Sequence, residues 1–404
     1  MKMIEGGITA PMGFSAGAVN CGIKKGSKKL DLAIIFSDKR CAAAGVYTKN
    51  LVKGAPIIVT GENLADGYAQ AVVVNSGNAN TCNADGYDKA KEMAKAAADM
   101  LGISENDMIV GSTGVIGQPI NNQVILKGIS ELKGRLSPAG GNDAAVAIMT
   151  TDLVKKEAAL EFELDGRTCR IGGICKGSGM IAPNMATMLA FITSDAAISP
   201  EALQASLKEV ADKTFNRVSV DGDTSTNDTL TVMANGLAGN AMVEAGSAGH
   251  KAFTEALYTI CVQLAKKIAG DGEGATKLLE CVVRNFKSEA RAGAIAKSVI
   301  SSSLVKAAFF GADANWGRIL CAIGYADIDC DVESIDVRFE SSAGNILVCQ
   351  NGASVDFDEE LAKKILGEKE ILIDIDMKSG AETAIAWGCD LTYDYVKING
   401  DYRT

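Results

Sequence analysis

The spacing of hydrophobic residues changes several times along this chain, and each spacing predicts a different kind of element. Short apolar runs bounded by turn residues predict buried strands at residues 31–36 and 71–74. Over residues 88–101 the apolar positions recur at intervals of three and four, and Gly102 can end the segment. That pattern predicts an amphipathic helix.

The middle of the chain combines a strand pair with two helices. Residues 160–164 and 168–171 flank the dipeptide Asp165-Gly166, which is typical of a tight turn between antiparallel strands. A Ser-Pro-Glu sequence then opens a predicted helix over residues 199–213, because serine is a good N-cap and proline is favoured in the first turn. A longer helix is predicted over residues 251–269.

The last third of the chain alternates again. Strands are predicted at residues 337–339, 346–349 and 371–375, with a helix at 358–366, and a final strand at 390–398. The sequence has no internal repeat. Hairpins mixed with helices predict mixed sheets flanked by helices, in a layered α/β or α+β fold.

Composition indicates a globular chain and narrows its partners. Of the 404 residues, 47% are hydrophobic and 22% are charged, as in ordinary proteins with a core. The net charge of −10 and the absence of a basic run argue against nucleic acid as a partner. The first residues lack the apolar run of a signal peptide, and the longest uncharged run, 177–194, is interrupted by Pro183 and Asn184. We therefore expect a cytoplasmic protein with no membrane partner.

Cysteine and histidine usage restricts the chemistry. The eleven cysteines include no C-x-x-C pair, so reduced thiols are expected rather than disulfides or a metal centre. His250 is the single histidine and lies in a run of small residues ahead of a predicted helix. We interpret His250 as a surface residue, so a catalytic base in this chain is expected to be something other than an imidazole.

The segment 176–189, KGSGMIAPNMATML, combines glycines, a lysine and hydroxyl side chains. Residues 177–182 fit the G-x-G-x-x-A pattern of dinucleotide-binding folds, but that pattern must open a helix and Pro183 would fall inside the helix. A glycine-rich turn that leads into a buried strand is a simpler structural interpretation. It accounts for the apolar end of the segment and leaves the polar part without a role.

A chemical role for the polar part is a threonine nucleophile that self-cleavage exposes. An N-terminal threonine carries its own base, because its free α-amine has an ordinary pKa of about 8. Thr187 follows the small residue Ala186, which would allow the threonine hydroxyl to attack the preceding carbonyl carbon. Such a site needs no histidine, in agreement with the composition.

Residues 221–228, DGDTSTND, begin like a calcium-binding loop. That loop requires a glycine at its sixth position and a glutamate at its twelfth, and this chain has Thr226 and Val232 there. We therefore predict a turn near the active site rather than a calcium site.

Further motifs are spread along nearly the whole chain. They are 8–14 (ITAPMGF), 74–80 (VNSGNAN), 111–117 (GSTGVIG), 149–152 (MTTD), 176–189, 220–228 (VDGDTSTND), 270–277 (GDGEGATK), 311–318 (GADANWGR) and 397–404 (KINGDYRT). Each motif is weak alone. Together and in this order they resemble the ArgJ family, the bifunctional ornithine acetyltransferases of arginine biosynthesis.

The resemblance implies that the chain cuts itself between Ala186 and Thr187. The products would be an α chain of residues 1–186 and a β chain of residues 187–404, with a C-terminal subdomain from about residue 280. It also implies stacked mixed sheets flanked by helices, with the two chains intertwined, and an α2β2 heterotetramer.

Site residues follow from the resemblance by their positions. Thr187 would be the nucleophile that accepts the acetyl group, and Thr113 and Gly114 would form the oxyanion hole. Lys176 suits either a substrate carboxylate or the oxyanion, and Glu273 suits the side-chain ammonium of ornithine. The implied substrate contacts are Thr150, Lys176, Thr187, Glu273, Asn399 and Thr404.

The implied reaction has two steps. N2-acetyl-L-ornithine acetylates Thr187 and leaves as ornithine, and L-glutamate then accepts the acetyl group. No metal or organic cofactor is implied, and acetyl-CoA is a second acetyl donor in some members of the family. Three other interpretations stay open: a self-cleaving aminopeptidase or amidase of the related DmpA-like group, a nucleotide-binding oxidoreductase that uses residues 177–182, and a non-catalytic interaction protein.

Overall fold

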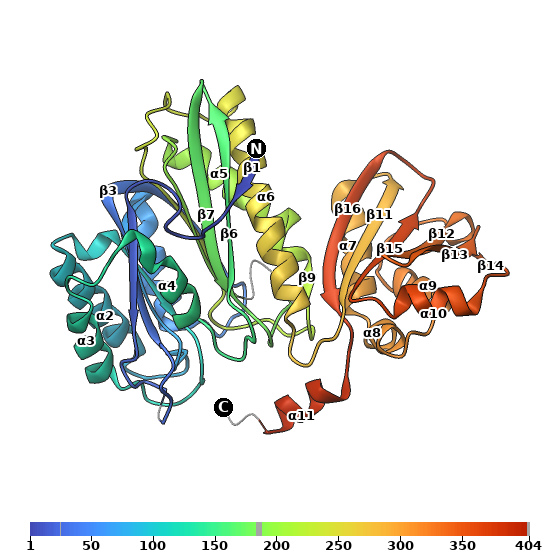
Figure 1. The fold of residues 1–404 in the computed structure, drawn as a ribbon, viewed down its shortest axis with the longest axis horizontal. Coiled ribbons are helices and arrows are strands. Elements are labelled where there is room, and N and C mark those ends of the chain that lie inside the picture. Colours follow the sequence, from blue (N-terminus) through green and yellow to red (C-terminus); the bar gives the residue numbers. More distant parts are fainter. Residues whose placement is uncertain (25, 183–187, 402–404) are drawn as a thin grey trace.

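The computed structural model describes residues 1–24, 26–182 and 188–401 and arranges them in two lobes that lie side by side (Figure 1). The larger lobe holds most of the first two thirds of the chain, and the smaller lobe holds most of the last third. Each lobe is built on its own mixed β-sheet, which is covered by helices. The last helix, α11 (Tyr393–Asp401), extends away from the smaller lobe (Figure 1).

Within the described ranges, the sheet of the larger lobe has nine strands. In order across the sheet they are β1 (Lys2–Ile4), β6 (Lys156–Leu164), β7 (Arg167–Lys176), β8 (Leu189–Ser194), β10 (Thr229–Ala234), β3 (Leu32–Tyr47), β4 (Tyr68–Asn75) and β5 (Met108–Ser112), while β2 (Phe14–Val19) pairs with β3. β8 is an interior strand, antiparallel to β7 on one side and parallel to β10 on the other. The chain that enters β8 therefore arrives in the middle of the sheet.

The sheet of the smaller lobe has seven strands in the same described ranges. Their order is β14 (Ala353–Ser354), β13 (Gly344–Gln350), β12 (Asp336–Ser341), β15 (Glu370–Asp376), β11 (Leu278–Phe286), β16 (Glu382–Cys389) and β9 (Val218–Ser219). β9 precedes β10 in the sequence but pairs with β16, so one short strand from the larger lobe's part of the chain completes the smaller sheet.

Helices cover the sheets because each buries one apolar face. Those of the larger lobe are α1 (Ala55–Asn63), α2 (Gly86–Leu101), α3 (Asn122–Glu131), α4 (Gly141–Ala147), α5 (Pro200–Lys213) and α6 (Ala248–Gly270). Those of the smaller lobe are α7 (Glu289–Ser301), α8 (Ser303–Phe310), α9 (Trp316–Gly324) and α10 (Glu359–Leu366). In the larger lobe, α2 and α3 pack on one face of β3 and β4, whereas α4 packs on the other face.

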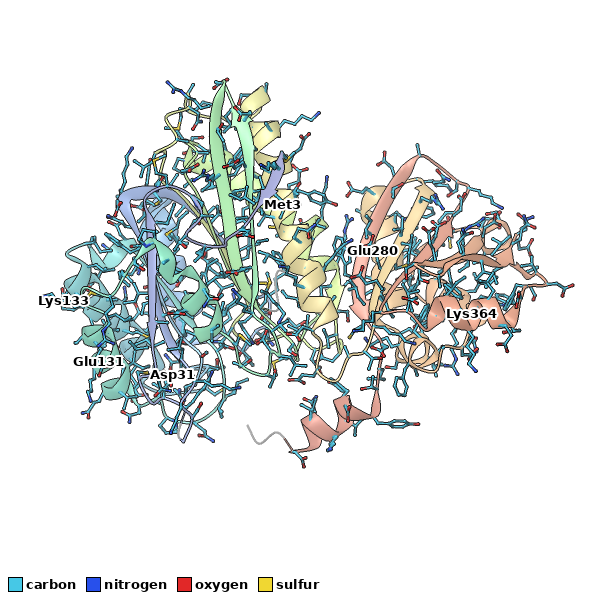
Figure 2. All side chains as sticks on the ribbon, viewed as in Figure 1. Met3, Asp31, Glu131, Lys133, Glu280 and Lys364 are labelled. Carbon is cyan, nitrogen blue, oxygen red and sulfur yellow. The ribbon has the colours of Figure 1, made fainter. Side chains whose placement is uncertain are left out.

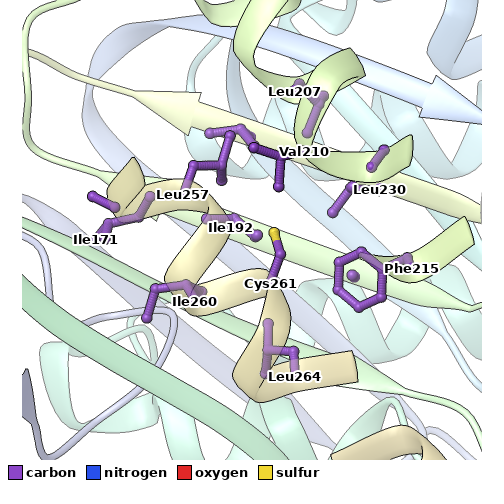
Figure 3. Packing of buried hydrophobic residues seen from close by; sticks show 14 of the residues in the cluster. Ile171, Ile192, Leu207, Val210, Phe215, Leu230, Leu257, Ile260, Cys261 and Leu264 are labelled. Atoms are coloured by element: carbon purple, nitrogen blue, oxygen red, sulfur yellow. The ribbon is translucent and has the colours of Figure 1, made fainter. Parts of the chain in front are cut away.

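The largest core lies between α5, α6 and the strands β7, β8 and β10. Its side chains are mainly aliphatic, and they pack around α6 (Figure 3). Residues that meet there include Ile171, Ile192, Leu207, Val210, Phe215, Leu230, Leu257, Ile260, Cys261 and Leu264. This core fixes the end of β7 against the C-terminal end of α6, and both ends carry residues of the site described below.

The predicted fold class, mixed sheets flanked by helices, is confirmed. Capping chemistry marks the elements that the sequence predicted best. The Ser199 hydroxyl accepts a hydrogen bond from the backbone N–H of Ala202 at the start of α5, and Gly102 ends α2 in the left-handed conformation. Asp165 and Gly166 form the turn between β6 and β7 with positive φ angles.

The predicted strand at residues 390–398 is wrong. The last strand of the smaller sheet is β16, and the chain leaves it where the Asp390 carboxylate accepts hydrogen bonds from the backbone N–H groups of Thr276 and Lys277. Residues Tyr393–Asp401 then form α11, in which no side chain is buried. Without a sheet edge to pair with, these residues satisfy their backbone groups locally in a helix.

Charged side chains project outward from the helices of both lobes, as Glu131 on α3 and Lys364 on α10 do in Figure 2. In the described part of the chain, no single helix is long and apolar enough to cross a membrane. Taken together, α7 and α8 reach the length and apolar composition of a membrane span, but they are bent by 58° where they meet.

Candidate functional site

Six of the residues predicted from the sequence line one cavity of about 240 Å³. They come from five segments that are far apart along the chain: Thr113 and Gly114 after β5, Thr150 after α4, Lys176 at the end of β7, Glu273 after α6, and Asn399 on α11. The fold therefore collects polar groups from both halves of the sequence around one space.

The Thr113-Gly114 turn forms one wall of the cavity. Gly114 has a φ of 127°, and a β-carbon at this position would lie 2.7 Å from the carbonyl carbon of Gly77. Only glycine fits both the conformation and the space. The turn is held by Asn75, whose backbone oxygen accepts from the N–H of Thr113 (3.0 Å) and whose side-chain oxygen accepts from the N–H of Gly77 (3.2 Å).

Lys176 is the buried cation of the cavity. Its ammonium lies 3.5 Å from the hydroxyl oxygen of Thr113, so the cation and the predicted oxyanion hole are neighbours. Burial lowers the pKa of Lys176 below its ordinary value, and the negative charge of Asp152 opposes part of that shift. For Asp152, burial favours a higher pKa, but the positive charges of Lys176 and Lys156 outweigh it and lower this pKa to about 2.

Glu273 supplies a carboxylate to the lining of the cavity. Its Oε2 atom accepts a hydrogen bond of 2.8 Å from the side-chain amide of Asn399, which joins α11 to the cavity. The backbone of Gly179 passes so close that a β-carbon there would lie 2.3 Å from the carboxyl carbon of Glu273. The glycine-rich segment therefore brings its backbone directly against an acidic side chain.

The described residues on both sides of 183–187 are hydrogen-bonded to the segment that runs from Asp221 to the start of β10. The Asp221 carboxylate accepts hydrogen bonds from the backbone N–H groups of Met180 (2.6 Å) and Ile181 (2.8 Å), and Met180 has a positive φ of 57°. On the other side, the backbone N–H of Thr229 donates to the oxygen of Met188 (2.8 Å). In the described range that follows Lys176, residues 177–182 form a turn rather than a helix, which argues against the nucleotide-binding interpretation.

Three predicted site residues, Ala186, Thr187 and Thr404, lie outside the described residues. Met188 and Leu189, which directly follow Thr187 in the sequence, line the cavity. The cleavage position and the nucleophile therefore stay predictions at this point.

Sequence reasoning missed residues that hold the cavity walls. Asn227 is buried, and its side-chain N–H groups donate to the backbone oxygens of Ala79 (2.6 Å) and Ser112 (3.0 Å). It thereby connects the 221–228 loop to the strand that carries Thr113. The motif around Asn227 was the available signal, and the prediction of a turn near the active site is consistent with residues 225–228, which line the cavity.

His250 lies in the first turn of α6 rather than in a loop before it. Its Nδ1 accepts from the backbone N–H of Gly246, and its Nε2 lies 3.0 Å from the backbone oxygen of Ala202. His250 is partly exposed and is not among the residues that line the cavity. All eleven cysteines are free thiols, in agreement with the predicted reduced state.

The lining groups suit a small molecule that carries both charges. An ammonium (Lys176) and a carboxylate (Glu273) line the same cavity, together with the hydroxyl-bearing residues Thr113 and Thr150 and the amide-bearing Asn399. Charged groups placed in this way can orient an amino acid through charge-assisted hydrogen bonds.

Comparison with known proteins places the chain in a family. The ArgJ family model matches residues 15–404. The "Arginine biosynthesis bifunctional protein ArgJ" of Caldanaerobacter subterraneus subsp. tengcongensis is 49% identical over 405 residues, and that of Symbiobacterium thermophilum is 50% identical over 406 residues; both alignments cover 100% of each chain. A crystal structure of the ArgJ protein from Bacillus halodurans is 46% identical with a TM-score of 0.50, and it covers 52% of this chain and 98% of its own. This chain belongs to the ArgJ family.

Proposed function

We propose that this protein transfers an acetyl group from N2-acetyl-L-ornithine to L-glutamate in arginine biosynthesis. The bifunctional ArgJ proteins that share about half of its residues over their full length support this proposal. The observation that carries it is the cavity in which Thr113, Gly114, Lys176 and Glu273 meet, because it offers an oxyanion site beside groups for an amino-acid substrate.

In the first step, the hydroxyl oxygen of Thr187 attacks the acetyl carbonyl carbon. The free α-amine of Thr187 accepts the hydroxyl proton, and the negative charge on the carbonyl oxygen is stabilised by the hydroxyl of Thr113 and the backbone N–H of Gly114. The amide bond then breaks, ornithine leaves with the proton, and acetyl-Thr187 stays behind. In the second step, the amine of glutamate attacks this ester and restores the threonine hydroxyl.

Substrate recognition follows from the charges in the cavity. The Glu273 carboxylate pairs with the side-chain ammonium of ornithine, and Lys176 pairs with a substrate carboxylate. Thr150, Asn399 and Thr404 donate or accept hydrogen bonds at the remaining polar atoms of the substrate. Since glutamate lacks the side-chain ammonium, the two substrates share the carboxylate contact and differ at Glu273.

Self-cleavage between Ala186 and Thr187 is part of the proposal, because it creates the amine that serves as the base. The solved Bacillus halodurans chain supports it: that chain matches about half of this one along nearly its whole length, as a processed piece would. The hydrogen bonds of Asp221 to Met180 and Ile181 also support it, because they hold the backbone ahead of the bond at a fixed place.

The proposal also covers the assembly, the location and the cofactors of the protein. The cut chains assemble as an α2β2 heterotetramer in the cytoplasm and need no metal or organic cofactor. Acetyl-CoA serves as a second acetyl donor for glutamate, in keeping with the bifunctional names of the relatives.

A denaturing intact-mass spectrum of the purified protein, followed by an acetyl-exchange assay, tests the proposal. We expect two species that match residues 1–186 and 187–404, with exchange between acetylornithine and glutamate. Thr187→Ala should give one uncut species and lose at least about 10³-fold in rate. Thr168→Ala, which changes an exposed threonine on β7, serves as the matched control and should keep both properties.

Two outcomes would contradict the proposal. A single full-length species in an active sample would rule out Thr187 as an N-terminal nucleophile. Release of free acetate from acetylornithine without glutamate would favour the aminopeptidase or amidase interpretation, in which water accepts the acyl group.

A further inference from the structure

Lys156, at the start of β6, is a lysine with no exposed side-chain surface. Moving an ammonium group from water into a protein interior is unfavourable unless charged partners compensate it. A lysine at such a position needs a physical reason, and Lys156 does not line the cavity. Its effect on the site must therefore act through other residues.

The partners of Lys156 are two carboxylates. Its ammonium donates to Oδ1 of Asp152 (2.6 Å) and to Oδ2 of Asp271 (2.5 Å). Burial favours a lower pKa for Lys156, but the attraction of Asp152 and Asp271 outweighs it and raises this pKa. The group thus stays a cation that joins the start of β6 to the C-terminal end of α6.

Each carboxylate in turn holds backbone groups beside the cavity. Asp152 accepts from the N–H of Thr150 (3.0 Å) and from that of Gly177 (2.7 Å), which directly follows Lys176. Asp271 accepts from the N–H groups of Leu153 and Val154. These contacts connect the loop that carries Thr150 with the strand end that carries Lys176.

The same network reaches Glu273. The backbone oxygen of Asp271 accepts from the hydroxyl of Ser178 (2.7 Å), and the N–H of Glu273 donates to the backbone oxygen of Ser178 (3.0 Å). Three segments of the cavity wall are therefore held together around one buried cation. The backbone of the Thr113-Gly114 turn has supports of its own in Asn75 and Asn227. Its link to this network is the 3.5 Å contact between the Lys176 ammonium and the Thr113 hydroxyl oxygen.

We propose that Lys156 is a positioning residue, which fixes Thr150, Lys176 and Glu273 relative to one another by binding Asp152 and Asp271. The inference rests on the proposed function, in which these three residues contact the substrates. Because the predicted oxyanion hole has its own supports, loss of the Lys156 cation should weaken substrate binding more than the chemical step.

Lys156→Met tests this inference, because it keeps the length of the side chain and removes the charge. Intact mass first gives the cut fraction, so that rates refer to cut protein alone. We expect kcat/KM to fall by about 10- to 100-fold, with the larger part in KM for both substrates. Lys156→Arg keeps the charge and should recover part of the loss.

Lys306→Met is the matched control. Lys306 is also a buried lysine, but it lies on α8 in the smaller lobe and donates to the backbone oxygen of Cys389. Its loss should lower the melting temperature to a similar extent while kcat/KM stays within about twofold of the original value.

Three results would overturn the inference: kcat/KM of Lys156→Met within about twofold of the unchanged protein, an equal loss in Lys306→Met, or a loss in kcat alone. If Lys156→Met does not fold, Asp271→Asn replaces it, and an unchanged KM would count against the inference. Calorimetric binding of ornithine separates the two proposals. A protein that binds ornithine without acetyl transfer contradicts the proposed function, whereas weaker binding by Lys156→Met still supports the positioning role.

Discussion

Gly114 has a backbone conformation and close neighbours that only glycine can accommodate. Its φ is positive, and the backbone of Gly77 and Asn78 lies within 3 Å of where a side chain would begin. Gly117, three residues later, also has a positive φ, but its surroundings are open. An alanine substitution at Gly117 tests the positive φ alone, whereas the same substitution at Gly114 tests the positive φ together with a steric clash.

Gly114→Ala should lower acetyl-transfer activity by at least about 10²-fold, because the added carbon forces the turn of the proposed oxyanion hole away from Gly77. Gly117→Ala should cost about 1 kcal/mol of unfolding free energy and leave the rate within about twofold. Exchange assays and urea unfolding of both variants provide the measurement. Equal activity of the two variants would show that the close approach at Gly114 does not matter for the reaction.

At this scale, the sequence could predict the residues that bear the chemistry but not those that support them. The motifs pointed to Thr113, Lys176 and Glu273, and all three line the cavity. The sequence does not indicate that Lys156 is buried, because it follows Lys155 and two adjacent lysines are typical of a solvent-exposed segment. Its burial depends on Asp271, which lies 115 positions along the chain.

Among the α-helices of the described residues, α11 is the one that buries none of its residues. A nine-residue helix of this kind has little stability of its own. It is held at its root by the hydrogen bond from the Thr392 hydroxyl to the backbone oxygen of Gly274, and near its end by Asn399 on Glu273. Its place beside the cavity thus depends on these polar contacts and on the edge-to-face contact of Tyr393 with Phe310, whose ring centroids are 5.5 Å apart.

A chain that ends at Thr392 tests the role of α11. We expect the unfolding free energy to fall by less than about 1 kcal/mol, because the removed residues bury almost nothing. The kcat/KM for acetylornithine should fall at least about 10-fold, because Glu273 loses Asn399. Urea unfolding and the exchange assay give both numbers, and a truncated chain with full activity would exclude α11 from substrate binding.

Element boundaries show where periodicity is a sufficient guide. The predicted helices 88–101 and 199–213 agree closely with α2 and α5, since caps mark their ends. The strand predicted at 31–36 continues to Tyr47 as β3, because the polar residues 37–40 lie at a bulge where the pairing with β4 shifts. Residues 390–398 were misassigned because a short polar-apolar segment satisfies either spacing.

The two lobes share β16. Along this strand, Ala384 and Ala386 face the core of the smaller lobe, whereas Trp387 packs into the core of the larger lobe. This alternation follows from the two faces of a strand. The indole N–H of Trp387 also donates to Glu280 (2.9 Å) on the neighbouring strand β11. The core of the larger lobe thus includes a side chain from the smaller lobe.

Trp387 can report on this coupling. In a Trp316→Phe variant it is the only tryptophan. We expect its fluorescence and the far-ultraviolet circular dichroism to change in one urea transition, with midpoints within about 0.2 M, because the shared core opens as a unit. Two separated transitions would show that the lobes unfold independently. Phe286→Leu, a substitution in the core of the smaller lobe, should move both signals together.

The order of strands lay beyond sequence reasoning. Local spacing predicts that a segment is a strand, but β8 meets β10 and β7 through contacts set by the whole sheet. The motifs predicted which residues belong to the site, but not that they line one cavity. The lining residues come from positions as distant in the sequence as Thr113 and Asn399.

The interior place of β8 decides what a cut ahead of Met188 means for the molecule. β8 and β10 would belong to the second fragment, yet they fill the sheet between β7 and β3 of the first. The two fragments could separate only if the backbone hydrogen bonds between β7 and β8 and between β10 and β3 were broken. If the fragments were made separately, each would expose unpaired backbone N–H and C=O groups on the strands that pair with the other fragment. If the proposed cut takes place, the peptide bond that it removes would be needed only until the two segments had formed one sheet.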